Sequence, residues 1–122
     1  MLYVDAGWIR NVQIEVSPRT PRFAAGALHC MAERHRYERI AGEPYCEEAP
    51  ARAATFPHTA LRLRPFTDCN ASTGVACVRA YMDGSGTPVD PQPGDWARLA
   101  ADIRSDEVDL TEAARLLRDW AA

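Results

Sequence analysis

Hydrophobic and polar residues alternate along residues 8–16, where polar positions separate Val12, Ile14 and Val16. A period of two is typical of a half-buried β-strand. A shorter partner strand is expected at residues 2–4, ahead of a turn signal. The chain is therefore predicted to open with extended structure.

Two more stretches have the features of strands. In residues 60–67, Leu61 and Leu63 alternate with polar side chains, and a proline near the end suggests an edge position. Residues 75–82 are apolar on both faces near their start, which is typical of a central strand. A glycine-rich turn follows at residues 83–86.

One long helix is predicted between these strands. Thr20 followed by Pro21 is a helix-start signal, and the helix is expected to continue to about Ile40. Its second half, residues 33–39, is charged nearly all round, which predicts a solvent-facing segment or a polar partner. The proline-rich residues 43–59 are then expected to form a long loop.

The C-terminal third has the clearest helical period. Apolar residues at i, i+3, i+4 and i+7 predict a helix that opens at Asp95. A second helix is predicted to start at Asp109, where Glu112 completes a capping-box pattern. The short connection between them favours a helical hairpin over about residues 95–121.

The predicted element order is β, α, β, β, α, α. This order favours an α+β fold with a small antiparallel sheet of three to four strands, packed by the N-terminal helix and the C-terminal helical hairpin. The length of 122 residues predicts one domain over residues 1–122.

Composition narrows the function classes. The net charge is −3, and every one of the 14 basic residues is arginine. An acidic chain is not attracted as a whole to nucleic acid or to anionic membranes. No segment approaches the roughly 20 apolar residues of a membrane span, and no signal sequence is recognisable, so a cytoplasmic protein without membrane contact is expected.

The four cysteines fit no metal or redox motif. CxxC is absent, and histidines six positions apart on a helix, such as His29 and His35, lie on different faces. No metal site and no cofactor are therefore predicted. Reduced thiols are expected in a cytosolic protein. If disulfides form, Cys69 with Cys77 across a hairpin and Cys30 with Cys46 are the candidate pairs.

Catalytic motifs are also absent from the sequence. A cysteine nucleophile paired with His29, His35 or His58 is the enzyme hypothesis, with Cys30, Cys46 or Cys69 as the nucleophile. No surrounding pattern supports any of these pairs. The balance favours a protein that is not an enzyme.

Charge in the C-terminal hairpin leads to the main functional prediction. Residues 95–119 hold seven acidic and four basic side chains. Such a surface suits a basic protein partner and speeds association with it. The prediction is a small regulatory or inhibitory protein of antitoxin, immunity or phage-inhibitor type, acting on another protein, with a homodimer also compatible. The predicted contact residues are Asp106, Glu107, Asp109 and Glu112.

The alternative is a nucleic-acid-binding protein. Arginines beside an aromatic side chain resemble a surface for phosphate contacts and base stacking. Nearby glutamates argue for a salt-bridged solvent face instead. The residues of this alternative are Arg34, Arg36, Tyr37, Arg39, Arg62, Arg64 and Arg79.

Overall fold

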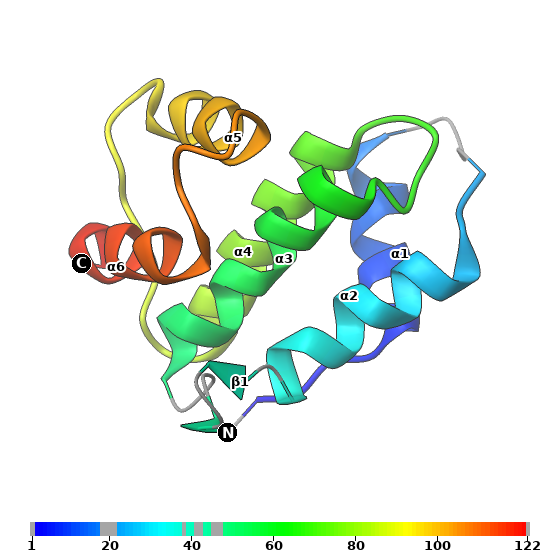
Figure 1. Ribbon diagram of the computed structural model, residues 1–122, viewed down its shortest axis with the longest axis horizontal. Helices are drawn as coiled ribbons and strands as arrows, with labels where there is room; N and C mark the ends of the chain where they lie inside the picture. The colour runs from blue at the N-terminus through cyan, green and yellow to red at the C-terminus, as the bar shows by residue number, and fades with distance from the viewer. Residues whose placement is uncertain (1, 18–21, 38, 41–42, 45–47, 122) are drawn as a thin grey trace.

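The computed structural model describes residues 2–17, 22–37, 39–40, 43–44 and 48–121. This part of the chain contains six helices and one very short antiparallel hairpin (Figure 1). The helices are α1 (Ala6–Val16), α2 (Ala25–Tyr37), α3 (Ala49–Leu63), α4 (Asn70–Gly84), α5 (Asp95–Arg104) and α6 (Leu110–Trp120). The hairpin pairs β1 (Arg39–Ile40) with β2 (Glu43–Pro44).

The predicted α+β fold with an antiparallel sheet is wrong. The predicted strands 8–16 and 75–82 lie entirely in helices α1 and α4, and the first half of the predicted strand 60–67 lies in helix α3. Residues 2–4 are not in a strand either. Within the described residues, the structure contains one sheet, which consists of the two-residue strands β1 and β2.

Helix α1 forms because a local cap outweighs the strand-like alternation. The Asp5 side chain accepts a hydrogen bond from the Trp8 N–H at 2.9 Å and satisfies one of the free donors of the first turn. Ile9 and Gln13, one turn apart, are buried. The β-branched residues that suggested a strand are helical here, since tertiary packing overrides a weak intrinsic preference.

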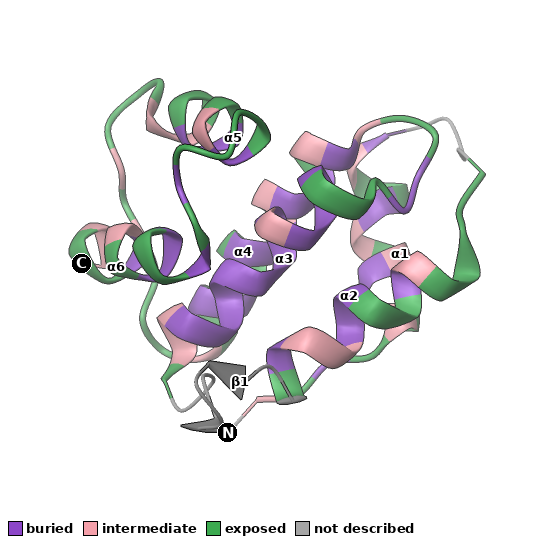
Figure 2. Cartoon of the chain, viewed as in Figure 1, coloured by how far each residue is buried: buried purple, intermediate pink, exposed green. Residues whose placement is uncertain are grey.

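Helix α3 is the centre of the molecule. Residues 51–57 and 59–61 are all buried, because α2, α4, α5 and α6 contact this helix (Figure 2). The predicted loop 43–59 is therefore wrong for residues 49–59. Pro50 stands in the first turn, where a missing N–H costs nothing, and Pro57 is accommodated inside the helix.

Helix α4 packs closely along α3. The buried residues Cys77, Val78, Tyr81 and Met82 follow a helical period rather than the period of two of a strand. A side-chain carbon added at Gly74 would lie 2.9 Å from the Pro57 Cα atom. Glycine at this position thus lets the two central helices approach each other.

The charged half of the predicted N-terminal helix turns partly inward. In α2, Arg34 donates a hydrogen bond to the Thr59 hydroxyl at 2.9 Å, and His35 is fully buried. The Val4 N–H donates to His35 Nε2 at 3.0 Å, which ties the N-terminal segment to the core. The prediction that this segment faces solvent or meets a polar partner is wrong for the buried His35, whereas Arg34 meets a polar partner.

The two C-terminal helices are confirmed as α5 and α6. Asp109 caps α6 as predicted, accepting from the Glu112 N–H at 2.8 Å. Both helices pack on α3, and the rings of Trp96 and Trp120 meet edge to face with centroids 5.1 Å apart. In the described part of the chain, no helix is long and apolar enough to cross a membrane.

Candidate functional site

The connection between the two central helices contains two non-glycine residues with left-handed backbone. Arg64 ends α3 and Cys69 precedes α4, both in the left-handed region with φ of 49° and 63°. A non-glycine residue costs roughly 1 kcal/mol or more in this conformation. The Asn70 side chain holds the turn between them, accepting from the Phe66 N–H at 3.0 Å and donating to its carbonyl at 2.7 Å.

The first turn of α4 has free backbone donors. Asp68 Oδ1 accepts from the Cys69 N–H at 2.8 Å, but no side chain caps the helix itself. Among the described residues, no acceptor is present for the N–H groups of Asn70, Ala71 and Ser72. Unpaired donors at a helix start carry partial positive charge and favour an anion.

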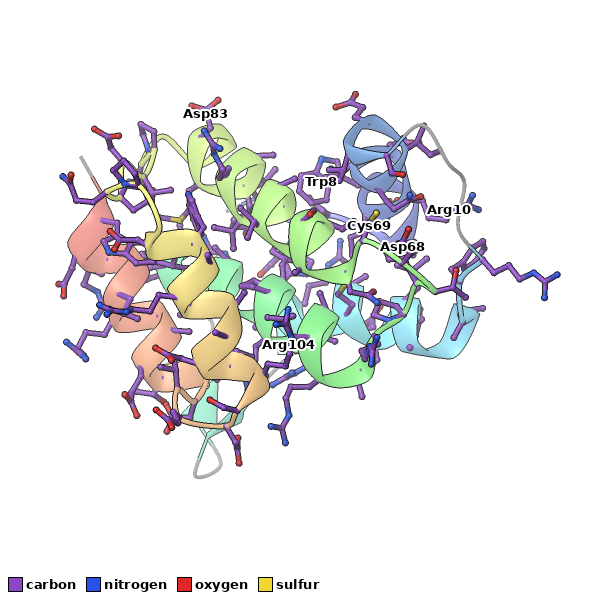
Figure 3. All side chains as sticks on the ribbon, turned by 90° about the horizontal axis from the view of Figure 1, so that it is seen from above. Trp8, Arg10, Asp68, Cys69, Asp83 and Arg104 are labelled. Carbon is purple, nitrogen blue, oxygen red and sulfur yellow. The ribbon has the colours of Figure 1, made fainter. Side chains whose placement is uncertain are left out.

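A pocket of about 340 Å³ lies at this helix start. Its two arginines come from separate elements, Arg64 from the end of α3 and Arg104 from the end of α5. Figure 3 labels Asp68 and Cys69 at the start of α4 and Arg104 at the end of α5. The lining residues are Leu61, Arg64, Thr67, Asp68, Cys69, Asn70, Ala71, Ser72 and Arg104.

The electrostatics of the pocket favour an anionic ligand. Neither Arg64 nor Arg104 has an ion-pair partner within the described residues. The pocket lining thus contains two positively charged guanidinium groups and the positive end of α4, but only one negatively charged carboxylate, that of Asp68. Guanidinium groups and helix N-termini are the donors that hold phosphate and carboxylate groups in proteins.

The predicted acidic contact residues lie on the α5–α6 connection and on the first turn of α6. Asp106 forms an ion pair with Arg62 at 3.0 Å, although its side chain remains 71% exposed. Asp109 is engaged in capping α6, while Glu107 and Glu112 are exposed. Two of the four are therefore occupied within the chain, and their role in partner binding stays a prediction.

The predicted arginine surface is divided among several parts of the molecule. Arg34 contacts Thr59 and His58, and the Arg36 guanidinium lies 4.8 Å from the centre of the Tyr3 ring. Arg62 pairs with Asp106. The remaining arginines are not with them: Arg64 lines the pocket, Arg79 lies on α4, and the side chains of Tyr37 and Arg39 lie outside the described residues.

Three of the four cysteines are described, and all three are free thiols. Cys69 and Cys77 stand at the start and in the middle of one helix, about 12 Å apart along its axis, which is beyond the reach of a disulfide. Burial raises the pKa of the Cys77 thiol to about 12. Cys30 is exposed on α2, and its suggested partner Cys46 lies outside the described residues.

The histidines do not form the predicted catalytic pairs with Cys69. His29 lies 3.8 Å from Glu33, His58 contacts Arg34 at 3.1 Å, and His35 is enclosed in the core. None of them lines the pocket that Cys69 shares. Over the described range, no three His, Cys, Asp or Glu side chains converge as metal ligands would.

Sequence reasoning missed this pocket because it placed β-strands at residues 60–67 and 75–82, on either side of the start of α4. A usable signal was present: Asn70, Thr73, Gly74, Cys77 and Val78 recur at helical spacing directly after Asp68. Arg104 had no such signal, because it reaches the pocket only through the packing of α5. Comparison of the chain with protein-family models and with curated proteins finds no match.

Proposed function

We propose that this protein binds a small phosphate-bearing anion in the pocket at the start of α4. The observation that carries the proposal is the convergence of Arg64, Arg104 and three unpaired backbone N–H groups on one pocket. The chain as a whole has a net charge of −3, so this cationic pocket contrasts with the overall charge. A charged ligand would be held by local donors rather than by the overall field.

The size of the pocket fits this ligand class. Its volume of about 340 Å³ is more than ten times the roughly 30 Å³ of one water molecule, which leaves space for a phosphate or a pyrophosphate group. Binding is proposed rather than catalysis, because the lining contains no imidazole and Asp68 already accepts a backbone hydrogen bond. The predicted regulatory role is compatible with a module that responds to such a ligand.

The test is calorimetric titration with inorganic phosphate and with pyrophosphate at low ionic strength. Arg64→Gln and Arg104→Gln should each weaken binding about tenfold, since each removes one charge-assisted contact. Arg98→Gln is the matched control, because Arg98 is an exposed arginine of α5 that does not line the pocket. Equal loss in all three variants would indicate a general charge effect and contradict the proposal, as would the absence of binding to the unmodified chain.

A further inference from the structure

An apolar groove follows the outer face of α4. It lies between the end of α1 and helix α5 and has a volume of about 730 Å³. In Figure 3, α4 extends from Cys69 at one end to Asp83 at the other, and α5 lies beside it. Residues that form the groove include Val16, Ala71, Val75, Ala76, Trp96 and Ala97.

The shape of the groove suits a helix. Small side chains at Ala71, Val75 and Ala76 follow one face of α4, while Ala97 and Ala100 face them from α5. Small residues along a helix face let the ridge of another helix approach closely. The groove extends along α4 from Ala71 to Arg79, about 12 Å or two helical turns.

The described part of this chain offers no apolar helix to fill the groove of a second copy. The buried faces of α5 and α6 already pack on the core through residues such as Leu99, Ile103, Leu110 and Leu117. The large exposed hydrophobic side chains Tyr3, Ile14, Phe23 and Leu63 belong to separate elements. The occupant is therefore expected from a different protein.

Arg79, at one end of the groove, indicates where the occupant carries a charged residue and of which sign. Arg79 is the charged residue of the groove lining, and its guanidinium is exposed without an ion-pair partner in the part of the chain that the structure describes. Asp83, one turn further along α4, does not pair with it. A free cation at one end of an apolar groove is complemented by an acidic side chain at the end of an apolar stripe.

We propose that this groove docks an amphipathic helix of a partner protein, with an acidic residue of that helix against Arg79. Apolar partner side chains at i, i+3, i+4 and i+7 would lie over the alanines, and the carboxylate would give the helix its direction. This site is separate in chemistry from the anion pocket, although both include Ala71 and Ser72. The proposal does not require a bound anion.

The test is selection from a displayed library of 16-residue amphipathic helical peptides with randomised end residues. We expect the selected peptides to carry an apolar stripe at helical spacing and an Asp or Glu at one end. Arg79→Glu should weaken their binding about tenfold and shift the selected end residue to Lys or Arg. Ala76→Arg should block the groove, whereas Arg98→Glu, on the exposed face of α5, should leave binding unchanged.

The outcomes separate this proposal from its competitors. Winners without helical periodicity, or winners that bind the Ala76→Arg and unmodified chains equally, would overturn it. Because an arginine at position 76 can disturb folding, Arg79→Glu alone also decides: an unchanged preference for acidic ends overturns the proposal. Dimers in sedimentation velocity that disappear in Arg79→Glu would instead identify a second copy as the occupant. Loss of phosphate binding in Arg104→Gln, with peptide binding kept, shows that the two sites fail independently.

Discussion

His35 is a buried histidine whose surroundings require the neutral form. The Val4 N–H donates to its Nε2 atom at 3.0 Å, and its Nδ1 atom shares a hydrogen bond with the Ala32 carbonyl. Because Nε2 accepts, Nδ1 carries the proton. The ring centroids of Phe56 and Tyr81 lie 5.3 and 5.8 Å from that of His35, and the residue is fully buried.

Burial lowers the pKa of His35, and the nearby charges of Arg36 and Arg52 lower it further. The Ala32 carbonyl and Glu33 act in the opposite direction, but desolvation is the largest effect. A depressed pKa in the folded state means that the unfolded chain binds the proton first. His35 therefore contributes stability above about pH 6.5, and that contribution is lost as the pH falls toward its folded-state pKa.

We expect the free energy of unfolding to fall as the pH drops below about 6.5, by at most about 1.4 kcal/mol per pH unit from this residue. Urea unfolding at a series of pH values measures it. His29→Gln is the matched control, because it removes an exposed histidine from the same helix α2. His35→Gln should reduce the overall stability and flatten the slope in this window. A slope that persists in His35→Gln would assign the titration to another group.

At the scale of elements, the contact between α3 and α4 depends on one missing side chain. A Cβ atom at Gly74 would stand 2.9 Å from the Pro57 Cα atom and 3.1 Å from the Ala60 Cβ atom. The nearest of these is backbone, which cannot rotate away. The helices must therefore separate if position 74 acquires a side chain.

Gly74→Ala should destabilise the protein by up to about 2 kcal/mol, because an overpacking cost of about 1–3 kcal/mol exceeds the roughly 1 kcal/mol gain in helix propensity. Gly26→Ala is the matched control in α2, where nothing lies within 4 Å of the added carbon. That variant should be neutral or up to about 1 kcal/mol more stable. Chemical denaturation of both variants measures the difference, and a stabilising Gly74→Ala would show that the helices are less tightly packed than described.

At the scale of the whole molecule, a single helical core predicts both the type of secondary structure in solution and the cooperativity of unfolding. The buried hydrophobic residues of the described helices form one cluster around α3 and α4. We expect a far-ultraviolet circular dichroism spectrum dominated by helix and one cooperative thermal transition. A spectrum rich in β-structure would restore the α+β prediction, and two separate transitions would indicate that α5 and α6 unfold independently.

Local signals were sufficient where a helix forms by its own sequence. The period of α5 and the Asp109 cap of α6 were both readable, because caps and amphipathic spacing act within a few residues. The same kind of signal was present in α4 and at the Asp5 cap of α1, but the strand predictions there followed the alternation in residues 8–16 and the two apolar faces of residues 75–82. The sequence of α1 and of α4 therefore contains local helix signals, although both segments were predicted as strands.

Tertiary structure alone decided the rest. Helix α3 carries polar residues at helical spacing, Arg52, Thr55, Thr59 and Arg62, but the neighbouring helices bury the first three, so this stripe does not face solvent. His35 became a core residue through Val4 and Phe56, which are distant along the chain. Arg64 and Arg104 meet at one pocket only because α5 packs on α3. The sequence by itself determined the caps and the amphipathic C-terminal helices, whereas contacts between distant segments determined the core and both candidate sites.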